Sequence, residues 1–374
     1  MKKSFISMLL LCFISVSLQA EAVIKIPAKK EKNISFYDDG GPELLLKAIN
    51  RQIKVMKNSR LSGKVNIGNY EGTLKDVYLS VVHLKKLVES WSNCQLSELT
   101  CRKNFNNSIE QDFEFYRPLS EKKDAHYTSY FSPTFKASKS QTSYYQYGIH
   151  GTPSDPNLVT KYTRNEIVLD QKLEETQKAL FYIDNPFDVF LLHVEGGGHI
   201  IDINTKKNYF LSYETTNRKS FSFIGPYMLK KGYISNGSVK SQRKFLEENP
   251  DKWYEIYDQT PNYVFFKVTK SEPLGMENIP LTPNRSLAMD RKKFARKGLP
   301  VFVSVKKPML VNGKVEIVKH QRLYLDQDTG GAIKGEARAD LYAGFGDEAQ
   351  FAADNVNHYG SMLILLLKPK FLVE

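Results

Sequence analysis

The sequence predicts a mainly β protein whose helices lie near its N-terminus. Two early stretches, 42–59 and 76–90, carry apolar residues spaced three and four apart, which is the period of an amphipathic helix. After Asp112 the chain changes to short runs rich in Tyr and Phe, interrupted by Gly, Pro, Asn and Ser. The chain has 374 residues, which is long enough for two domains.

Local patterns predict the individual elements. Thr73 or Asp76 is the expected N-cap of the second helix, 76–90. Segment 128–133 is interpreted as an aromatic turn. Apolar runs predict four strands, at 187–194, 263–268, 300–305 and 322–325.

The first 22 residues have the pattern of a secretion signal. An apolar run over 5–18 follows two lysines and precedes Ala20-Glu21-Ala22, an A-x-A cleavage site. The run is too short to span a membrane. Cys12 follows a bulky leucine, where a lipidation site requires a small residue. We therefore expect cleavage after residue 22 and a periplasmic protein with no lipid anchor and no transmembrane segment.

Export also bears on the two remaining cysteines, Cys94 and Cys101. In an oxidising compartment they are expected to form a disulfide, and a pair of buried thiols is the alternative.

The formal net charge of the chain is +12 and becomes +11 without Lys2, Lys3 and Glu21. Such a charge suits an anionic polymer of the cell envelope or a membrane surface, although general solubility explains it equally well. The basic residues form no nucleic-acid motif, so we expect no nucleic-acid partner.

The segment 323–346 is the strongest candidate for a functional site. It holds Asp326, Asp328, Glu336 and Asp340 together with five glycines. Asp328 follows a predicted strand, and glycines let the chain turn tightly or a ligand approach closely. A second carboxylate meets glycines at 195–198, where Glu195 precedes three of them.

Three known loops share parts of this pattern, and each fails at one point. An EF-hand beginning at Asp326 would need a glutamate at Ala337. A P-loop would need Gly-Lys-Ser/Thr, which 331–335 lacks. An aspartic protease would need a second Asp-Thr/Ser-Gly, and the chain has only one. The seven histidines show no spacing typical of zinc ligands, so we expect no metal and no cofactor.

Four segments together resemble the family of membrane-bound lytic murein transglycosylase A. They are TSYFSP at 128–133, VEGGG at 194–198, PLTPNRSLAMD at 280–290, and QDTGGAIKG at 327–335 with ADLYAGFG at 339–346. The resemblance covers roughly 128–368 and is most specific in the C-terminal block.

The resemblance implies a double-psi β-barrel domain with an inserted second β-domain and a sugar-binding groove between them. The barrel domain, with its N-terminal helices, would comprise 23–133 and 273–374. The inserted domain would comprise 134–272.

The resemblance also implies an activity. The family cleaves the β-1,4 bond between N-acetylmuramic acid and N-acetylglucosamine without water, leaving 1,6-anhydromuramoyl ends. Its single catalytic aspartate falls on Asp340, which would act first as acid and then as base. Asp328 would support it, either by raising its pKa as a neighbouring carboxylate or by holding the glycine loop.

Further residues of the matching motifs are expected to bind substrate. Arg285 and Lys334 would hold Asp328 or reach carboxylate-bearing peptide or lactyl groups, and a structural ion pair is the alternative. The expected substrate-binding residues are Thr128, Tyr130, Glu195, Gly196, Gly198, Arg285, Gly330, Gly331, Lys334 and Tyr342.

The sequence departs from the family pattern at four positions. Glu195 replaces Gln, Gly197 replaces Ser, Ser129 replaces Gly, and Ser132 replaces an acidic residue. Two alternatives therefore stay open: a non-catalytic peptidoglycan-binding or assembly module, and a hydrolytic muramidase that pairs Asp340 with Glu195. The expected partners are glycan strands and other proteins of cell-wall synthesis or degradation, and the chain is expected to be a monomer.

Overall fold

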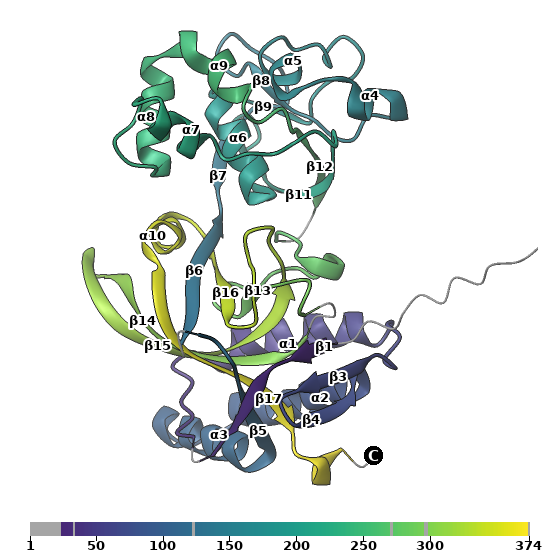
Figure 1. The fold of residues 1–374 in the computed structure, drawn as a ribbon, viewed down its shortest axis with the longest axis vertical. Coiled ribbons are helices and arrows are strands. Elements are labelled where there is room, and N and C mark those ends of the chain that lie inside the picture. The colour runs from purple at the N-terminus through teal and green to yellow at the C-terminus, as the bar shows by residue number, and fades with distance from the viewer. Residues whose placement is uncertain (1–23, 33, 122–123, 270–271, 295–297, 373–374) are drawn as a thin grey trace, which may run out of the picture.

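The computed structural model describes residues 24–32, 34–121, 124–269, 272–294 and 298–372. The predicted signal peptide and Cys12 lie outside these ranges. The described molecule is elongated: one part is built from both ends of the chain and the other from its middle (Figure 1). Strands β6 and β7 lead from the first part into the second (Figure 1).

The first part combines N-terminal helices with long strands. Its elements are β1 (Ile24–Ile26), β2 (Ala28–Glu31), α1 (Pro42–Met56), β3 (Lys64–Ile67), β4 (Tyr70–Thr73), α2 (Leu74–Ser92), α3 (Glu98–Asp112), β5 (Phe113–Pro118), β6 (Ala125–Ser132), β13 (Ser286–Met289), β14 (Pro300–Val311), β15 (Lys314–Asp328), β16 (Arg338–Phe345), α10 (Asp347–Asn355) and β17 (Asn357–Leu367).

Six of these strands form a closed barrel. They pair in the order β14-β15-β13-β16-β6-β17, and β17 pairs again with β14 to close the ring. The pairs β13–β15 and β16–β6 are parallel, whereas β13–β16 is antiparallel. Closure leaves no unpaired edge within the ring. Outside the ring, β5 and β2 extend the sheet from β17. The fold class predicted from the sequence is confirmed.

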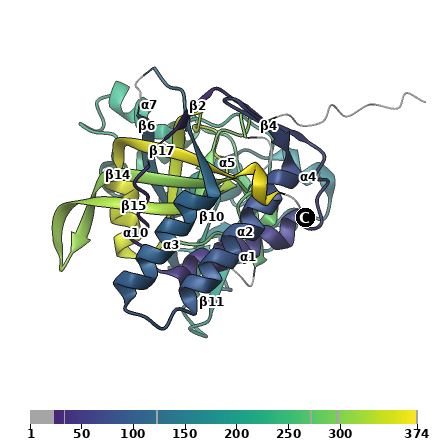
Figure 2. The ribbon, with the colours of Figure 1, turned by 90° about the horizontal axis from the view of Figure 1, so that it is seen from below.

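The helices pack on the barrel through apolar faces. Ile49 of α1, Val81 of α2 and Ile364 of β17 are fully buried in one continuous core. Both predicted N-terminal helices are present, and the backbone N–H of Thr73 donates to Asp76 Oδ2 at 2.7 Å at the start of α2. Helix α3 was not predicted, because its apolar residues are few and it buries polar ones. Figure 2 shows α1, α2 and α3 together beneath the barrel.

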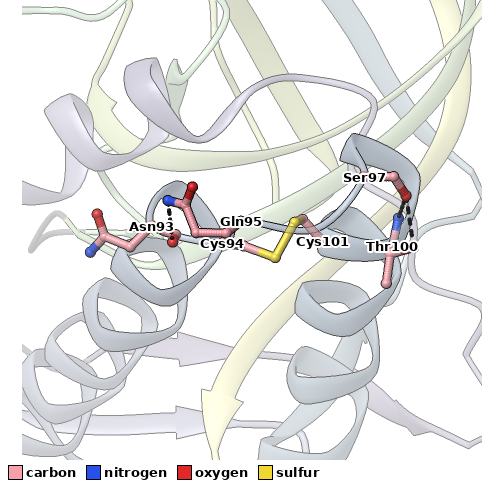
Figure 3. Close-up of a disulfide and its surroundings, with 6 residues drawn as sticks. All are labelled: Asn93, Cys94, Gln95, Ser97, Thr100 and Cys101. Atoms are coloured by element: carbon pink, nitrogen blue, oxygen red, sulfur yellow. Dashed lines mark hydrogen bonds between the residues drawn. A yellow bond between two sulfur atoms is a disulfide. The ribbon is translucent and has the colours of Figure 1, made fainter.

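A disulfide fixes the connection between α2 and α3. Cys94 follows the end of α2, and Cys101 lies in the first turn of α3 (Figure 3). Their sulfur atoms are bonded at 2.06 Å, with the two Cα atoms 5.8 Å apart.

The middle part of the chain holds both strands and helices. Strands β12, β11, β10 and β7 form one sheet in that order, and β8 pairs with β9. The elements are β7 (Thr134–Ala137), β8 (Tyr147–Ile149), α4 (Pro156–Lys161), α5 (Arg164–Val168), β9 (Phe181–Ile183), α6 (Pro186–Glu195), β10 (Gly197–Asp202), β11 (Asn208–Thr216), α7 (Ile224–Lys230), α8 (Val239–Glu248), α9 (Trp253–Tyr257) and β12 (Val264–Thr269).

Two separate hydrophobic clusters form the core of this middle part. They draw their buried residues from between Phe135 and Phe266, whereas the core of the barrel and its helices draws on both ends of the chain. The domain limits at 134 and 272 stay a prediction, and this separation of cores supports it.

Two local predictions are wrong, one in the middle part of the chain and one in the barrel. The apolar run 187–194 is helix α6, because Asn185 caps its N-terminus, Pro186 favours a first helical turn, and Gly196 ends it with φ +69°. A short run that is apolar on all sides cannot be assigned from its period alone. Segment 128–133, interpreted as a turn, lies largely in strand β6, whose residues alternate between buried and partly exposed over most of its length.

Candidate active site

A cavity of about 330 Å³ lies where the barrel meets the middle part of the chain. The barrel side contributes residues from β6, β13, β15, β16 and α10, and the middle part contributes the end of α6 and the start of α8. The lining residues are Ser129, Tyr130, Phe131, Val194, Glu195, Val239, Ala288, Asp328, Thr329, Gly330, Ile333, Asp340, Ala353 and Asp354.

Strand register places the two predicted aspartates on either side of Ala288. In β13, Ala288 is aligned with Asp328 of β15 on one side and with Asp340 of β16 on the other. Thr128 of β6 is aligned with Asp340 from the far side. Pairing of the neighbouring strands β15, β13, β16 and β6 thus brings residues 128, 288, 328 and 340 to one wall of the barrel.

Asp340 is held by a chain of two hydrogen bonds. Thr128 Oγ1 donates to Asp340 Oδ1 at 2.6 Å, and Arg338 Nη2 donates to Thr128 Oγ1 at 2.7 Å. Burial raises the pKa of Asp340 and outweighs the lowering by the Thr128 hydrogen bond and by the charges of Arg338 and His126. Asp340 is therefore a carboxyl group that keeps its proton to a higher pH than an exposed aspartate does.

Asp328 has a different environment. Tyr130 donates its hydroxyl to Asp328 Oδ2 at 2.6 Å, and the backbone N–H of Thr329 donates to Asp328 Oδ1 at 2.8 Å. Its carboxylate thus anchors Tyr130 and the start of the glycine loop. Because burial is the main cause of the raised pKa of Asp340, the contacts of Asp328 favour the second predicted role, that of holding the loop.

Glu195 faces the same cavity from the end of α6. Burial, followed by the negative charges of Asp340 and Asp354, raises the pKa of Glu195 to about 8. At neutral pH this side chain is therefore mostly protonated and uncharged, so it presents one hydroxyl donor and one carbonyl acceptor. In this state it offers the same kinds of hydrogen-bonding group as the amide of a glutamine.

Arg285 corrects one sequence prediction. It is 1% exposed and forms a bidentate ion pair with Asp38: Nη1 lies 2.7 Å from Oδ2, and Nη2 lies 2.9 Å from Oδ1. Arg285 Nη1 also donates to the carbonyl of Leu323 at 2.9 Å. Arg285 therefore lies outside the cavity lining and pairs with Asp38 instead of Asp328. Of the two alternatives left by the sequence, the structure contains the structural ion pair.

Several other predicted substrate contacts also lie away from the cavity. Tyr342 is 1% exposed, its hydroxyl lies 2.9 Å from the hydroxyl of Ser132, and its ring packs against that of Tyr130 with 5.3 Å between the ring centroids. Gly198 is buried against Leu192 and Pro133. Among the described residues, the cavity lining also omits Gly196, Gly331 and Lys334. Thr128 does not line it either, and acts through its hydrogen bond to Asp340.

Arg338 and His126 were not among the predicted site residues. Both act on Asp340, and their positions were accessible in principle: in a strand, residues two apart share a face, so Arg338 accompanies Asp340 and His126 accompanies Thr128. Asp354 was not predicted either, because its helix α10 has no clear apolar period.

Within the described ranges, no group of three or more His, Cys, Asp or Glu side chains is placed to hold a metal ion. No helix there combines the length and apolar character needed to cross a membrane.

Comparison with protein families decides the relationship. Residues 126–267 match the family model described as the MltA specific insert domain, and residues 285–366 match the 3D domain. The chain belongs to the MltA family. The insert-domain match contains Glu195, and the 3D-domain match contains Asp328 and Asp340, so residues of both line the cavity.

Curated relatives agree with this assignment. The chain is 31% identical over 243 residues to membrane-bound lytic murein transglycosylase A of Vibrio cholerae serotype O1, covering 63% of each chain. It is 30% identical over 248 residues to the protein of the same name from Escherichia coli K12, covering 65% of this chain and 66% of that protein. The matches thus span slightly less than two thirds of the length of these relatives.

Solved structures of this family share the fold. The membrane-bound lytic murein transglycosylase of Agrobacterium tumefaciens superposes with a TM-score of 0.70 at 22% identity, covering 92% of this chain and 98% of that one. The structure of E. coli MltA with bound chitohexaose gives 0.68 at 23% identity, covering 93% and 97%.

Proposed function

We propose that this MltA-family chain is a peptidoglycan lytic transglycosylase. It cleaves the β-1,4 bond between N-acetylmuramic acid and N-acetylglucosamine and leaves a 1,6-anhydromuramoyl end. The observation that carries the proposal is Asp340: one carboxyl group with a raised pKa, positioned by Thr128 and open to a cavity. The names of the curated relatives, and the chitohexaose bound to E. coli MltA, support a glycan substrate.

In the first step Asp340 acts as a general acid. Its raised pKa keeps a proton available for the glycosidic oxygen as the bond to C1 of the muramoyl residue breaks. Thr128 donates to the other carboxyl oxygen, which fixes the orientation of the group and stabilises the carboxylate that forms.

In the second step the same group acts as a base. The carboxylate accepts the proton of the C6 hydroxyl of the muramoyl residue while that oxygen bonds to C1. An intramolecular nucleophile benefits from proximity, and it replaces the water that two-carboxylate glycosidases activate. One carboxyl group therefore completes the cycle and returns to its protonated state.

A hydrolytic muramidase is the second candidate, and Glu195 is the observation that favours it, because it faces Asp340 in the same cavity. With Asp340 as the general acid, a hydrolase needs Glu195 as a carboxylate, either as base or as nucleophile. Because the pKa of Glu195 is raised to about 8, the group is mostly neutral at pH 7 and unsuited to either task. This favours the lytic reaction.

Asp340→Asn tests the proposal. Asparagine keeps the size of the side chain but cannot exchange the proton, so cleavage of purified sacculi should fall by at least ~10²–10⁴-fold. Glycan binding should persist, because the fold and the cavity remain. Undiminished cleavage by this variant would remove Asp340 from the chemistry.

The cellular setting is proposed on the same basis. The N-terminal signal pattern, the relationship to enzymes named as acting on murein, and the basic net charge support a periplasmic protein that works on glycan strands. We propose that it acts as a monomer. Other proteins of cell-wall synthesis or degradation are proposed as further partners. The signal pattern and the bulky residue before Cys12 support release by cleavage without a lipid anchor.

A further inference from the structure

A second cavity, of about 410 Å³, adjoins the Asp340 network, because its lining includes His126 and Arg338, whose charges act on Asp340. Its wall includes His126, Lys334, Arg338 and Tyr359. In the parallel pair β6–β16, His126 is aligned with Arg338, and Thr128 with Asp340. Residues two apart in a strand share a face and are separated by roughly 7 Å. Arg338 in the wall of the second cavity therefore lies only two residues along β16 from Asp340, the proposed acid.

The groups in this wall are suited to carboxylates beside an apolar surface. Lys334 is exposed and brings an ammonium group, and Arg338 brings a partly buried guanidinium. The ring of Tyr359 stacks on His126 with 4.8 Å between centroids and 20° between planes, and Tyr359 is 46% exposed. This stack offers a flat face against which a ligand can pack.

Acidic residues occupy separate places around the cavity. Glu336 also lines the cavity, and its charge is balanced by Lys293, whose Nζ lies 2.7 Å from Oε1. Glu121 and Asp124 lie at the exposed side of the cavity. The cavity thus has a cationic side next to β16 and an anionic rim, an arrangement that complements a ligand carrying both carboxylates and an amine.

We propose that this second cavity binds the peptide attached to the muramoyl residue, with a free carboxylate of that peptide at Lys334 and Arg338. The inference rests on the proposed function, because it places the muramoyl residue at Asp340. The peptide is linked through the lactyl group of the same sugar whose C1–O bond Asp340 would break, so it leaves the chain close to the reacting atoms. A cavity whose wall begins two residues along β16 from Asp340 is within reach of this peptide.

The assignment makes Lys334 a specificity-determining residue. A charge-assisted hydrogen bond to a carboxylate favours peptide-bearing glycan over stripped glycan. Arg338 also donates to Thr128, so its replacement would disturb Asp340 directly. Lys334 is the cleaner position to change, because it lies outside the catalytic cavity.

The test compares kcat/KM on peptide-bearing glycan strands with kcat/KM on the same strands after an amidase has removed the peptides. Lys334→Gln should lower the ratio of the two values by about fivefold, within the range of an ordinary hydrogen bond, because solvent screens the charge of the exposed Lys334. Tyr359→Ala should lower it as well. Lys314→Gln, an identical charge change at the exposed tip of the β14–β15 hairpin, should leave the ratio as in the unchanged protein.

A binding measurement separates this inference from the proposed function. The Asp340→Asn protein, titrated with each glycan, should bind the peptide-bearing strands more tightly, and addition of Lys334→Gln should remove that preference. An equal effect of Lys334→Gln on both glycans would overturn the peptide site while leaving the enzyme assignment intact. If the unchanged protein cleaves neither glycan, the proposed function fails, and the binding preference still decides the peptide site.

Discussion

At the scale of single residues, environment gives similar carboxyl groups different roles. Asp340 is half-buried and hydrogen-bonded to Thr128 through one oxygen, Asp328 is engaged through both oxygens, and Glu195 is half-buried and close to two other acids. Burial raises the pKa of Asp340 and of Glu195. The sequence located these three residues through their glycine neighbours, but it could not rank them, because burial arises from chain segments far apart.

Glu195 should contribute to the pH dependence of the free energy of unfolding. Its pKa rises from 4.5 to about 8 on folding, so between these values the folded state binds more protons than the unfolded state. The contribution of Glu195 to the free energy of unfolding therefore falls as pH rises through this window. Glu195→Gln should flatten this part of the curve, measured by urea denaturation at several pH values from 5 to 9.

The same variant separates the two candidate reactions. At pH 7 Glu195→Gln should keep most of its cleavage of sacculi, because the amide resembles the neutral acid that it replaces. A loss as large as that of Asp340→Asn would instead assign Glu195 a chemical role and favour a two-carboxylate hydrolase.

At the scale of elements, the structure contains the predicted helices and strands where the sequence shows a clear apolar period or a capping residue. α1, α2 and β12 follow from apolar spacing, and β15 ends at Asp328 as expected. α6 was mistaken for a strand because its run is apolar on all sides, so caps rather than period decide it. α3 was missed because it is largely polar and the disulfide, as well as burial, supports it.

The Cys94–Cys101 disulfide should stabilise the α2–α3 connection. It closes a short loop, with a sequence separation of 7, for which loop entropy gives about 2–3 kcal/mol. Replacing both cysteines by Ala should lower the free energy of unfolding by that amount in denaturant titrations without reductant. Two titratable thiols in the denatured, unreduced protein would show that the bond does not form.

At the scale of the whole molecule, contacts between distant segments assemble the site. The Asp38–Arg285 pair joins the segment before α1 to β13, and Asp38 Oδ2 also accepts the backbone N–H of Leu323 of β15 at 2.8 Å. Arg285 stands out in the sequence through its motif, which left a substrate contact and a structural ion pair as alternatives. Its true partner lies 247 residues away, at a position that no local pattern marks.

Asp38→Asn should therefore act on folding and leave the chemistry alone. It leaves the buried Arg285 without a counter-charge, which costs about 3–5 kcal/mol. Thermal unfolding should occur at a markedly lower temperature, whereas kcat/KM per folded molecule should stay close to that of the unchanged protein. A large change in KM with normal stability would return Arg285 to the substrate site.

The central claim is that one carboxyl group, Asp340, breaks the glycosidic bond without water, and heavy-oxygen water tests it most directly. Sacculi digested by the protein in H₂¹⁸O would be analysed by mass spectrometry of the released muropeptides. We predict 1,6-anhydromuramoyl ends without ¹⁸O, because the C6 hydroxyl supplies the oxygen that bonds to C1. Reducing muramoyl ends carrying ¹⁸O at C1 would contradict the account and assign a hydrolytic reaction to the site.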